Sequence, residues 1–95
     1  MKYQRYGLQV ERPNAADEGS PVTDENITRW VKMLLLEINE PPHCCWTGTQ
    51  SGNAAVHVLK RRVDYAPRFH IIIFQGRESF CADLTEEEAA EFLMT

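Results

Sequence analysis

Residues 68–75 read RFHIIIFQ, and this stretch decides the fold that we expect. A β-strand has a period of two, so its side chains divide between two faces, with Phe69, Ile71 and Ile73 on one and His70, Ile72 and Phe74 on the other. A strand that is apolar on both faces is typical of the covered centre of a sheet. We therefore expect a central strand here, with a long helix over one face and either a short helix or a second subunit over the other.

The long helix is predicted earlier in the chain, from Thr23 to about Asn39. Apolar residues recur there at helical spacing, namely Ile27, Trp30, Val31, Leu34, Leu35 and Ile38. Thr23 or Asp24 can cap the first turn, and the prolines at 41–42 cannot continue the helix. The segment therefore has both an apolar stripe and clear ends.

Further strands are predicted on both sides of this helix. Residues 2–12 alternate polar with apolar side chains and indicate a first strand, and residues 13–22 are expected to form a surface loop. After the helix, residues 43–50 and 54–63 flank a turn signal and predict a hairpin. A helix over 54–62 stays open as an alternative, although the β-branched valines of this segment favour a strand.

A second hairpin is expected to join residues 68–75 to residues 79–84. Thr85 and Glu88 then form a capping box that opens a short C-terminal helix, whose apolar face is Ala89, Phe92 and Leu93. The expected order is strand, helix, four strands, helix. It predicts one α+β domain over residues 1–95, with a mainly antiparallel sheet of about five strands.

Composition argues against a membrane or extracellular protein. The longest apolar runs, 33–36 and 71–74, are far shorter than the roughly 20 residues of a membrane helix. The first residues lack the continuous apolar core of a signal peptide. Three cysteines are an odd number, and Cys44 and Cys45 are adjacent, so a disulfide framework is not expected. We therefore expect reduced thiols and a cytoplasmic location.

Signatures of catalysis and of cofactor binding are missing from the sequence. His43, Cys44 and Cys45 are adjacent and lack the spacing of a zinc-binding pair, so we expect no metal ion and no cofactor. The glycines are scattered and match no phosphate-binding loop. A cysteine-dependent enzyme stays an alternative, because His57 or His70 could lie near a thiol in the folded chain.

Charge is segregated along the chain, which has a net charge of −4. Between residues 41 and 77 there are five basic residues and one acid, whereas six acids and no base follow from residue 78. The bases cluster with aromatic residues, and the candidate partner-binding residues are Lys60, Arg61, Arg62, Tyr65, Arg68 and Trp46. Such a cluster can bind an acidic protein surface or a nucleic acid.

We therefore expect a non-enzymatic protein-binding module, acting as an adaptor or as an inhibitor of a larger protein. A homodimer is a candidate form, and the edge of the sheet is a candidate contact surface. The first alternative is a nucleic-acid-binding protein that uses the same basic cluster. The second alternative is the cysteine-dependent enzyme.

Overall fold

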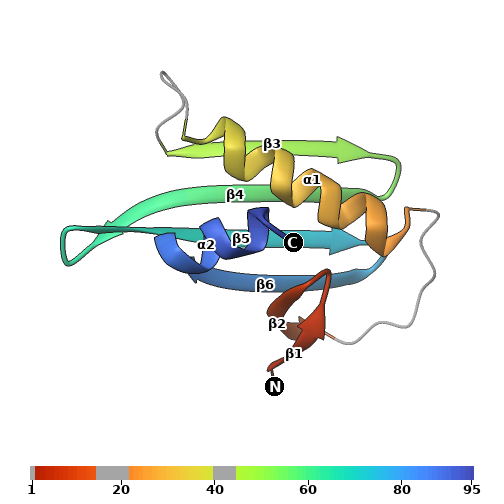
Figure 1. Cartoon of the computed structure of the whole chain (residues 1–95). Coiled ribbons are helices and arrows are strands. Elements are labelled where there is room, and N and C mark those ends of the chain that lie inside the picture. The colour runs from red at the N-terminus through yellow and green to blue at the C-terminus, as the bar shows by residue number, and fades with distance from the viewer. Residues whose placement is uncertain (1, 15–21, 40–44) are drawn as a thin grey trace.

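The computed structural model describes residues 2–14, 22–39 and 45–95. Its elements are β1 (Lys2–Arg5), β2 (Leu8–Asn14), α1 (Asp24–Glu37), β3 (Trp46–Ser51), β4 (Ala54–Val63), β5 (Ala66–Gln75), β6 (Glu78–Thr85) and α2 (Glu86–Leu93). The strands form one antiparallel sheet in the order β1-β2-β6-β5-β4-β3 (Figure 1). The α+β class is confirmed. The sheet has six strands rather than about five.

The additional strand comes from the N-terminal segment, which was expected to be a single strand. Tyr6 and Gly7 both have a positive φ, 60° and 80°, and they make a two-residue turn between β1 and β2. The backbone of β2 continues to Asn14, so the expected start of a loop at Pro13 is wrong. The pairing of β2 with β6 is irregular between Glu11 and Asn14, which is where a sheet tolerates proline. The rest of the expected loop, residues 15–21, lies outside the described residues.

The long helix forms where its apolar stripe predicts it. Thr23 is the N-cap, and its side-chain oxygen accepts a hydrogen bond from the backbone N–H of Asn26 at 3.2 Å. The expected stripe lies on the sheet and is fully buried except at Trp30, which is partly buried: Ile27, Val31, Leu34, Leu35 and Ile38. The helix ends at Glu37, two residues before the expected end.

Three hairpins connect the remaining strands. Gly52 and Asn53 lie between β3 and β4, and residues 54–63 are a strand, so the alternative helix over 54–62 is wrong. Gly76 and Arg77 lie between β5 and β6, as the second expected hairpin requires. The first hairpin was expected to begin at His43. Residues 43 and 44 lie outside the described residues, and β3 begins at Trp46.

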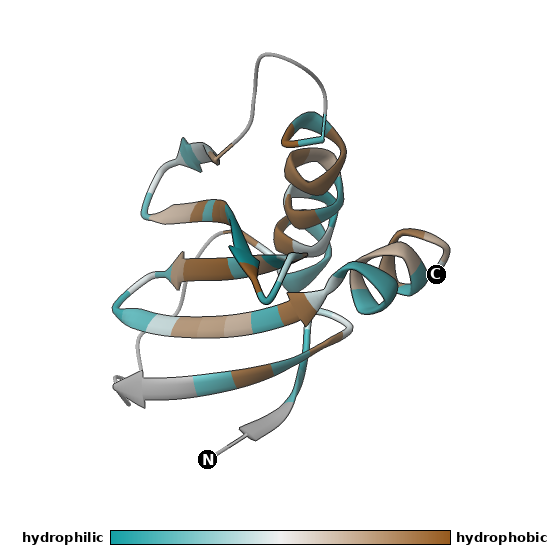
Figure 2. Cartoon of the chain, turned by 90° about the vertical axis from the view of Figure 1, so that its left-hand side faces the viewer, coloured by the Kyte–Doolittle hydropathy of each residue, from teal (hydrophilic) through white to brown (hydrophobic). Residues whose placement is uncertain are grey.

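The central strand is β5, which pairs with β4 on one side and β6 on the other. Its inner face is fully buried, as expected, and its outer face carries Ile72 half-buried and Phe74 43% exposed. Of the two coverings expected for the outer face, the short helix is wrong, because α2 lies on the same side of the sheet as α1 (Figure 2). Thus the described chain places no helix over the outer face.

The sequence around Thr85 explains where α2 begins. Its hydroxyl accepts a hydrogen bond from the N–H of Glu88 at 3.1 Å, and the Glu88 carboxylate accepts one from the N–H of Thr85 at 3.0 Å. This capping box starts the helix at the residue that follows β6. The chain therefore turns at once, and Ala89 and Phe92 are buried on the inner side.

A polar network holds the first turn of α1 to the sheet. The buried Gln75 accepts hydrogen bonds from the Tyr6 hydroxyl and from Nη2 of Arg5, the latter at 3.3 Å. Its own Nε2 donates to the backbone oxygen of Val22 at 2.7 Å and to Oδ1 of Asp24 at 3.2 Å. One glutamine side chain therefore joins the β1–β2 turn, the end of β5 and the start of α1.

The ion pair between Arg5 and Asp24 in this network lowers the pKa of the Asp24 carboxyl. Nε of Arg5 donates to Oδ2 of Asp24 at 2.9 Å, and this hydrogen bond holds the pKa of the Asp24 carboxyl below its usual range. The Arg5 guanidinium also lies 4.7 Å from the ring centroid of Phe80 and 3.3 Å from a carboxylate oxygen of Glu78. Arg5 thus ties the start of α1 to the beginning of β6.

Replacing Gln75 with alanine is expected to lower the free energy of unfolding by about 1–3 kcal/mol, because the buried Tyr6 hydroxyl loses its acceptor. Gln50→Ala is the matched control, since Gln50 is an exposed strand residue, and it should change stability by no more than about 0.5 kcal/mol. Urea unfolding followed by circular dichroism measures both values. Equal stability of the two variants would contradict the role of Gln75.

The Asp24 carboxyl should make stability depend on pH. Its pKa is lowered on folding from an ordinary value of 3.8, so its contribution is complete above that pH and is lost as the pH falls through the folded value. We expect Asp24→Asn to be less stable than the unchanged chain at neutral pH, and the difference to disappear in acid. Unfolding curves of both chains across this pH range test the expectation, and a difference that is constant with pH would refute it.

Candidate functional site

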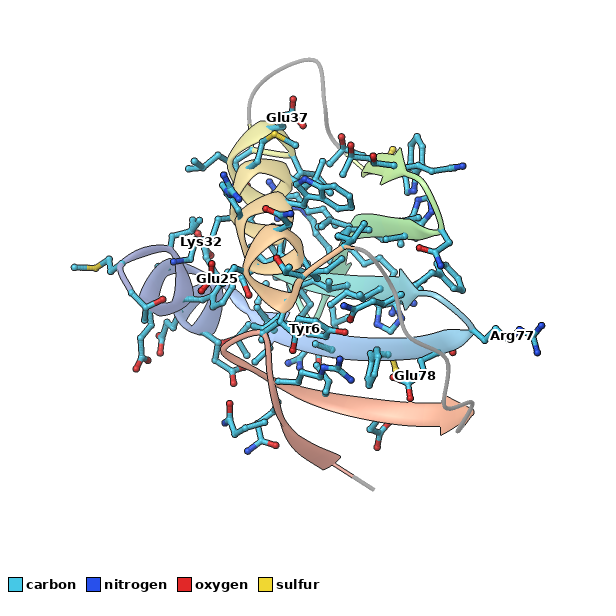
Figure 3. All side chains as sticks on the ribbon, turned by 90° about the vertical axis from the view of Figure 1, so that its right-hand side faces the viewer. Tyr6, Glu25, Lys32, Glu37, Arg77 and Glu78 are labelled. Carbon is cyan, nitrogen blue, oxygen red and sulfur yellow. The ribbon has the colours of Figure 1, made fainter. Side chains whose placement is uncertain are left out.

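The side of the sheet away from the helices, called the open face below, is not covered by any helix of the described chain. Figure 3 shows side chains projecting from both sides of the sheet, whereas the helices lie on only one. The strand registers place apolar and polar residues together on the open face, among them Trp46, His57, Leu59, Ile72 and Phe74. An exposed apolar patch on a small domain is a sign of an interaction surface.

Aromatic rings form a row across three strands of the open face. The indole of Trp46 on β3 stacks on the imidazole of His57 on β4, with ring centroids 5.7 Å apart and an interplanar angle of 24°. Phe74 on β5 meets the other side of this row edge-on, 6.2 Å from His57 and at 80°. Trp46 is still 55% exposed and Phe74 43% exposed. The row is therefore ordered by its own contacts and also open to a partner.

Gly48 makes this row sterically feasible. It lies opposite His57 in the β3–β4 pair, between the strand positions of Trp46 and Gln50. A Cβ atom at Gly48 would lie 2.7 Å from Nδ1 of His57 and 3.1 Å from Cζ2 of Trp46. Only a residue without a side chain leaves the two rings this close together.

Successive side chains of a strand point to opposite faces, so the predicted basic cluster is divided between the two faces of the sheet. Arg61 and Arg68 lie opposite each other on the open face, on the same face as Trp46. Nη2 of Arg68 forms an ion pair with Oδ2 of Asp83 at 3.4 Å. Both partners are partly exposed, so the pair contributes little to stability. The open face thus combines the ring row with a basic end, which is formed by Arg61 and Arg68.

Lys60 and Arg62 lie on the inner side of β4, away from this surface. The Lys60 ammonium donates to Oδ1 of Asn39 at 3.0 Å and lies 5.9 Å from the ring centroid of Phe69. Lys60 is therefore occupied in holding the end of α1 to the sheet. Arg62 is exposed and lies opposite Pro67 in the strand pair. The structure does not bring these two residues together with Trp46.

Tyr65 lies at the tip of the β4–β5 hairpin, which projects beyond α2 at one end of the sheet (Figure 1). It is 97% exposed, and both Asp64 and Tyr65 have a positive φ, 53° and 67°. Left-handed backbone costs a bulky residue more than it costs glycine. The hairpin therefore displays an exposed aromatic ring at a conformational cost.

Acidic residues border this hairpin. A groove of about 600 Å³ separates its base from the first turn of α2, and the lining includes Arg68, Glu86 and Glu87. Asp83 and Glu11 add further negative charge on the open face. The surroundings of the basic end are thus mixed in charge.

Among the described residues, Cys81 and His70 lie at diagonal positions of the β5–β6 pair on the open face and line the same pocket. Cys81 is half-buried and lies opposite Ile72 and Glu11, and Cys45 is exposed. His57 and His70 share the open face at diagonal positions, for which strand geometry gives a separation of about 7–8 Å. Cys44 and His43 lie outside the described residues. Over residues 2–14, 22–39 and 45–95, no group of three or more His, Cys, Asp and Glu side chains could hold a metal ion.

The sequence prediction included Trp46 but missed its neighbours His57, Phe74 and Gly48. The two-residue period does place His57 and Phe74 on one face of each strand. Their adjacency depends on the pairing register, which follows from the turns at Gly52–Asn53 and 64–65. Turn positions combined with alternation could have found the ring row.

Comparisons with known proteins do not assign this chain to a family. No family model matches the sequence, and no curated protein or solved structure is similar enough to match it. No helix among the described residues has the length and apolar character needed to cross a membrane. The geometry of the open face therefore carries the functional argument.

Replacing Gly48 with alanine is expected to displace the Trp46 indole from His57, because the new Cβ would overlap Nδ1. Overpacking of this kind costs about 1–3 kcal/mol of stability. In NMR spectra the His57 ring protons should lose the upfield shift that a stacked indole causes. Gln50→Ala, two residues along the same face of β3, is the control and should keep that shift. An unchanged His57 signal in Gly48→Ala would disprove the stack.

Proposed function

We propose that this chain is a non-enzymatic protein-binding module, an adaptor or an inhibitor of a larger protein, which receives its partner on the open face. The observation that carries this proposal is the exposed ring row of Trp46, His57 and Phe74. Aromatic residues are enriched at the centres of protein interfaces, where they supply much of the binding energy. Fully burying a large apolar side chain contributes about 1.5–3 kcal/mol, so covering two partly exposed rings is favourable.

The charges around the ring row suit a protein partner with an acidic rim. Arg61 and Arg68 can pair with carboxylates, and arginine does so with two parallel hydrogen bonds. Tyr65 at the hairpin tip can extend the contact beyond the sheet. Interfaces of this kind have an apolar centre and a polar border, which is the arrangement of side chains on the open face.

A nucleic-acid-binding protein is the second candidate function, because one observation favours it. Aromatic rings on an uncovered sheet face, with arginines beside them, can stack unpaired bases and contact phosphates. The net charge of −4 and the acids on the same face and around the hairpin base weigh against it, since they repel a polyanion. Protein binding is therefore the first proposal.

A cytoplasmic location is part of the proposal. It is supported by the cysteine pattern of the sequence, because three cysteines, two of them adjacent, do not suit a disulfide framework. A protein partner in the same compartment is expected.

The proposal predicts that capture of a partner depends on the ring row. We expect a tagged chain to retain a protein from a lysate of the source organism, and the double variant Trp46→Ala, Phe74→Ala to lose it. Leu36→Ala is the matched control, because Leu36 is 58% exposed but lies on α1, on the opposite side of the sheet. Circular dichroism should show that both variant chains stay folded.

Nuclease treatment separates the two candidate functions. Capture that survives nuclease and requires Trp46 and Phe74 supports the protein-binding module. Capture that disappears with nuclease, or that weakens strongly between low and moderate salt, supports the nucleic-acid alternative. Equal capture by the double variant and by Leu36→Ala would overturn the assignment of the open face.

A further inference from the structure

Within the part of the chain that the structure describes, the outer edge of β3 is a strand edge without the usual protection. The strand pairs with β4 in an unbroken register from Trp46 to Ser51, and on its other side the described residues supply no strand. Its sequence, WTGTQS, contains no charge and no proline. Natural edge strands usually carry lysine, proline or a bulge, or are very short, because these features prevent pairing with another chain. The opposite edge, β1, has only four residues and includes Lys2 and Arg5.

The hydrogen bonds of β3 show which of its backbone groups face outward. The N–H of Lys60 donates to the backbone oxygen of Cys45 at 3.0 Å, so Cys45 points toward β4. Along an antiparallel strand, successive residues direct their backbone N–H and C=O groups alternately toward one neighbouring strand and toward the other side. The N–H and C=O groups of Trp46, Gly48 and Gln50 therefore point away from the sheet, and no described residue pairs with them.

We propose that β3 pairs antiparallel with β3 of a second copy of this chain around a two-fold axis. Residues opposite each other in a sheet share a face, so the register must pair outward residues with outward residues. Full overlap of the strand places Gly48 opposite the partner subunit's Gly48, and Trp46 opposite the partner subunit's Gln50. Each copy then exchanges the backbone hydrogen bonds of its outward residues, and the two sheets become continuous.

The side chains along this edge fit a second copy of the chain. No like charges meet, because β3 is uncharged.

The expected strength follows from the size of the contact. A short strand pair with small flanking contacts lies at the low end of specific interfaces, below about 1,200 Å². We therefore expect a dissociation constant on the order of micromolar. The dimer and the proposed function are tested separately, because the dimer uses the backbone of β3 whereas partner capture uses side chains of the open face.

The first test removes one outward N–H from the edge. Gln50→Pro deletes a donor that β4 does not use, whereas Gln50→Ala keeps the donor and is the matched control. Light scattering of the purified chains should give twice the 10.9 kDa of one chain for the unchanged protein and for Gln50→Ala, and a single chain mass for Gln50→Pro. Circular dichroism confirms that each variant is folded.

The second test reads the register directly. In the proposed dimer Cys45 lies opposite the partner subunit's Ser51, in a pair close enough for a disulfide. Ser51→Cys should therefore give a covalent dimer under mild oxidation. Within one chain the two positions are about 20 Å apart along the strand, so they cannot bridge. Adding Cys45→Ser should abolish the product, and Gln9→Cys, at an exposed site on β2, should not form it.

Either test can overturn the dimer without touching the proposed function. A single-chain mass for the unchanged protein up to high micromolar concentration would refute it, as would a dimer that persists in Gln50→Pro. Failure of Ser51→Cys to cross-link in a chain that is dimeric by mass would refute the register. Capture of a partner through Trp46 and Phe74 is measured separately, so its loss or survival bears on the open face alone.

Discussion

Burial of the inner sides of β4 and β5 beneath α1 is the interaction on which the rest of the structure depends. Val56, Val58, Ile71 and Ile73 are fully buried there, and α1 contributes a stripe that fills the space above them. The polar network at Gln75 fixes the start of α1 and thereby its position over the sheet. α2 follows β6 directly through its capping box and packs on the same side of the sheet, where Ala89 and Phe92 are buried. Both helices therefore cover the same face of the sheet.

The open face is the physical consequence of that asymmetry. β5 has apolar side chains on both sides, yet only one side is covered by the described chain. Stacking and edge contacts among Trp46, His57 and Phe74 remove part of this apolar area from water, while large parts of the two outer rings stay exposed. Exposed apolar area of this kind favours association, and the ordered row reduces the entropy that a partner must offset on binding.

The features that the sequence predicts are those set by local chemistry. The stripe of α1, its cap at Thr23, the capping box at Thr85 and the two-faced β5 all depend on spacing within one segment. The hairpin at Tyr6 and Gly7 was missed because a tyrosine with positive φ gives no turn signal. The side on which α2 packs and the ring row depend on tertiary contacts and on strand register, which periodicity alone does not specify.

Trp46 links the two surfaces, because its ring belongs to the open face and its backbone to the outer edge of β3. A two-fold pairing of β3 would join two open faces into one sheet surface with a ring row on each side of the axis. Two linked sites bind a repeated or two-fold symmetric partner far more tightly than one, provided that their spacing fits. An uncharged edge strand carries a risk of uncontrolled association. Closing it with a second copy removes that risk and doubles the surface available to a partner.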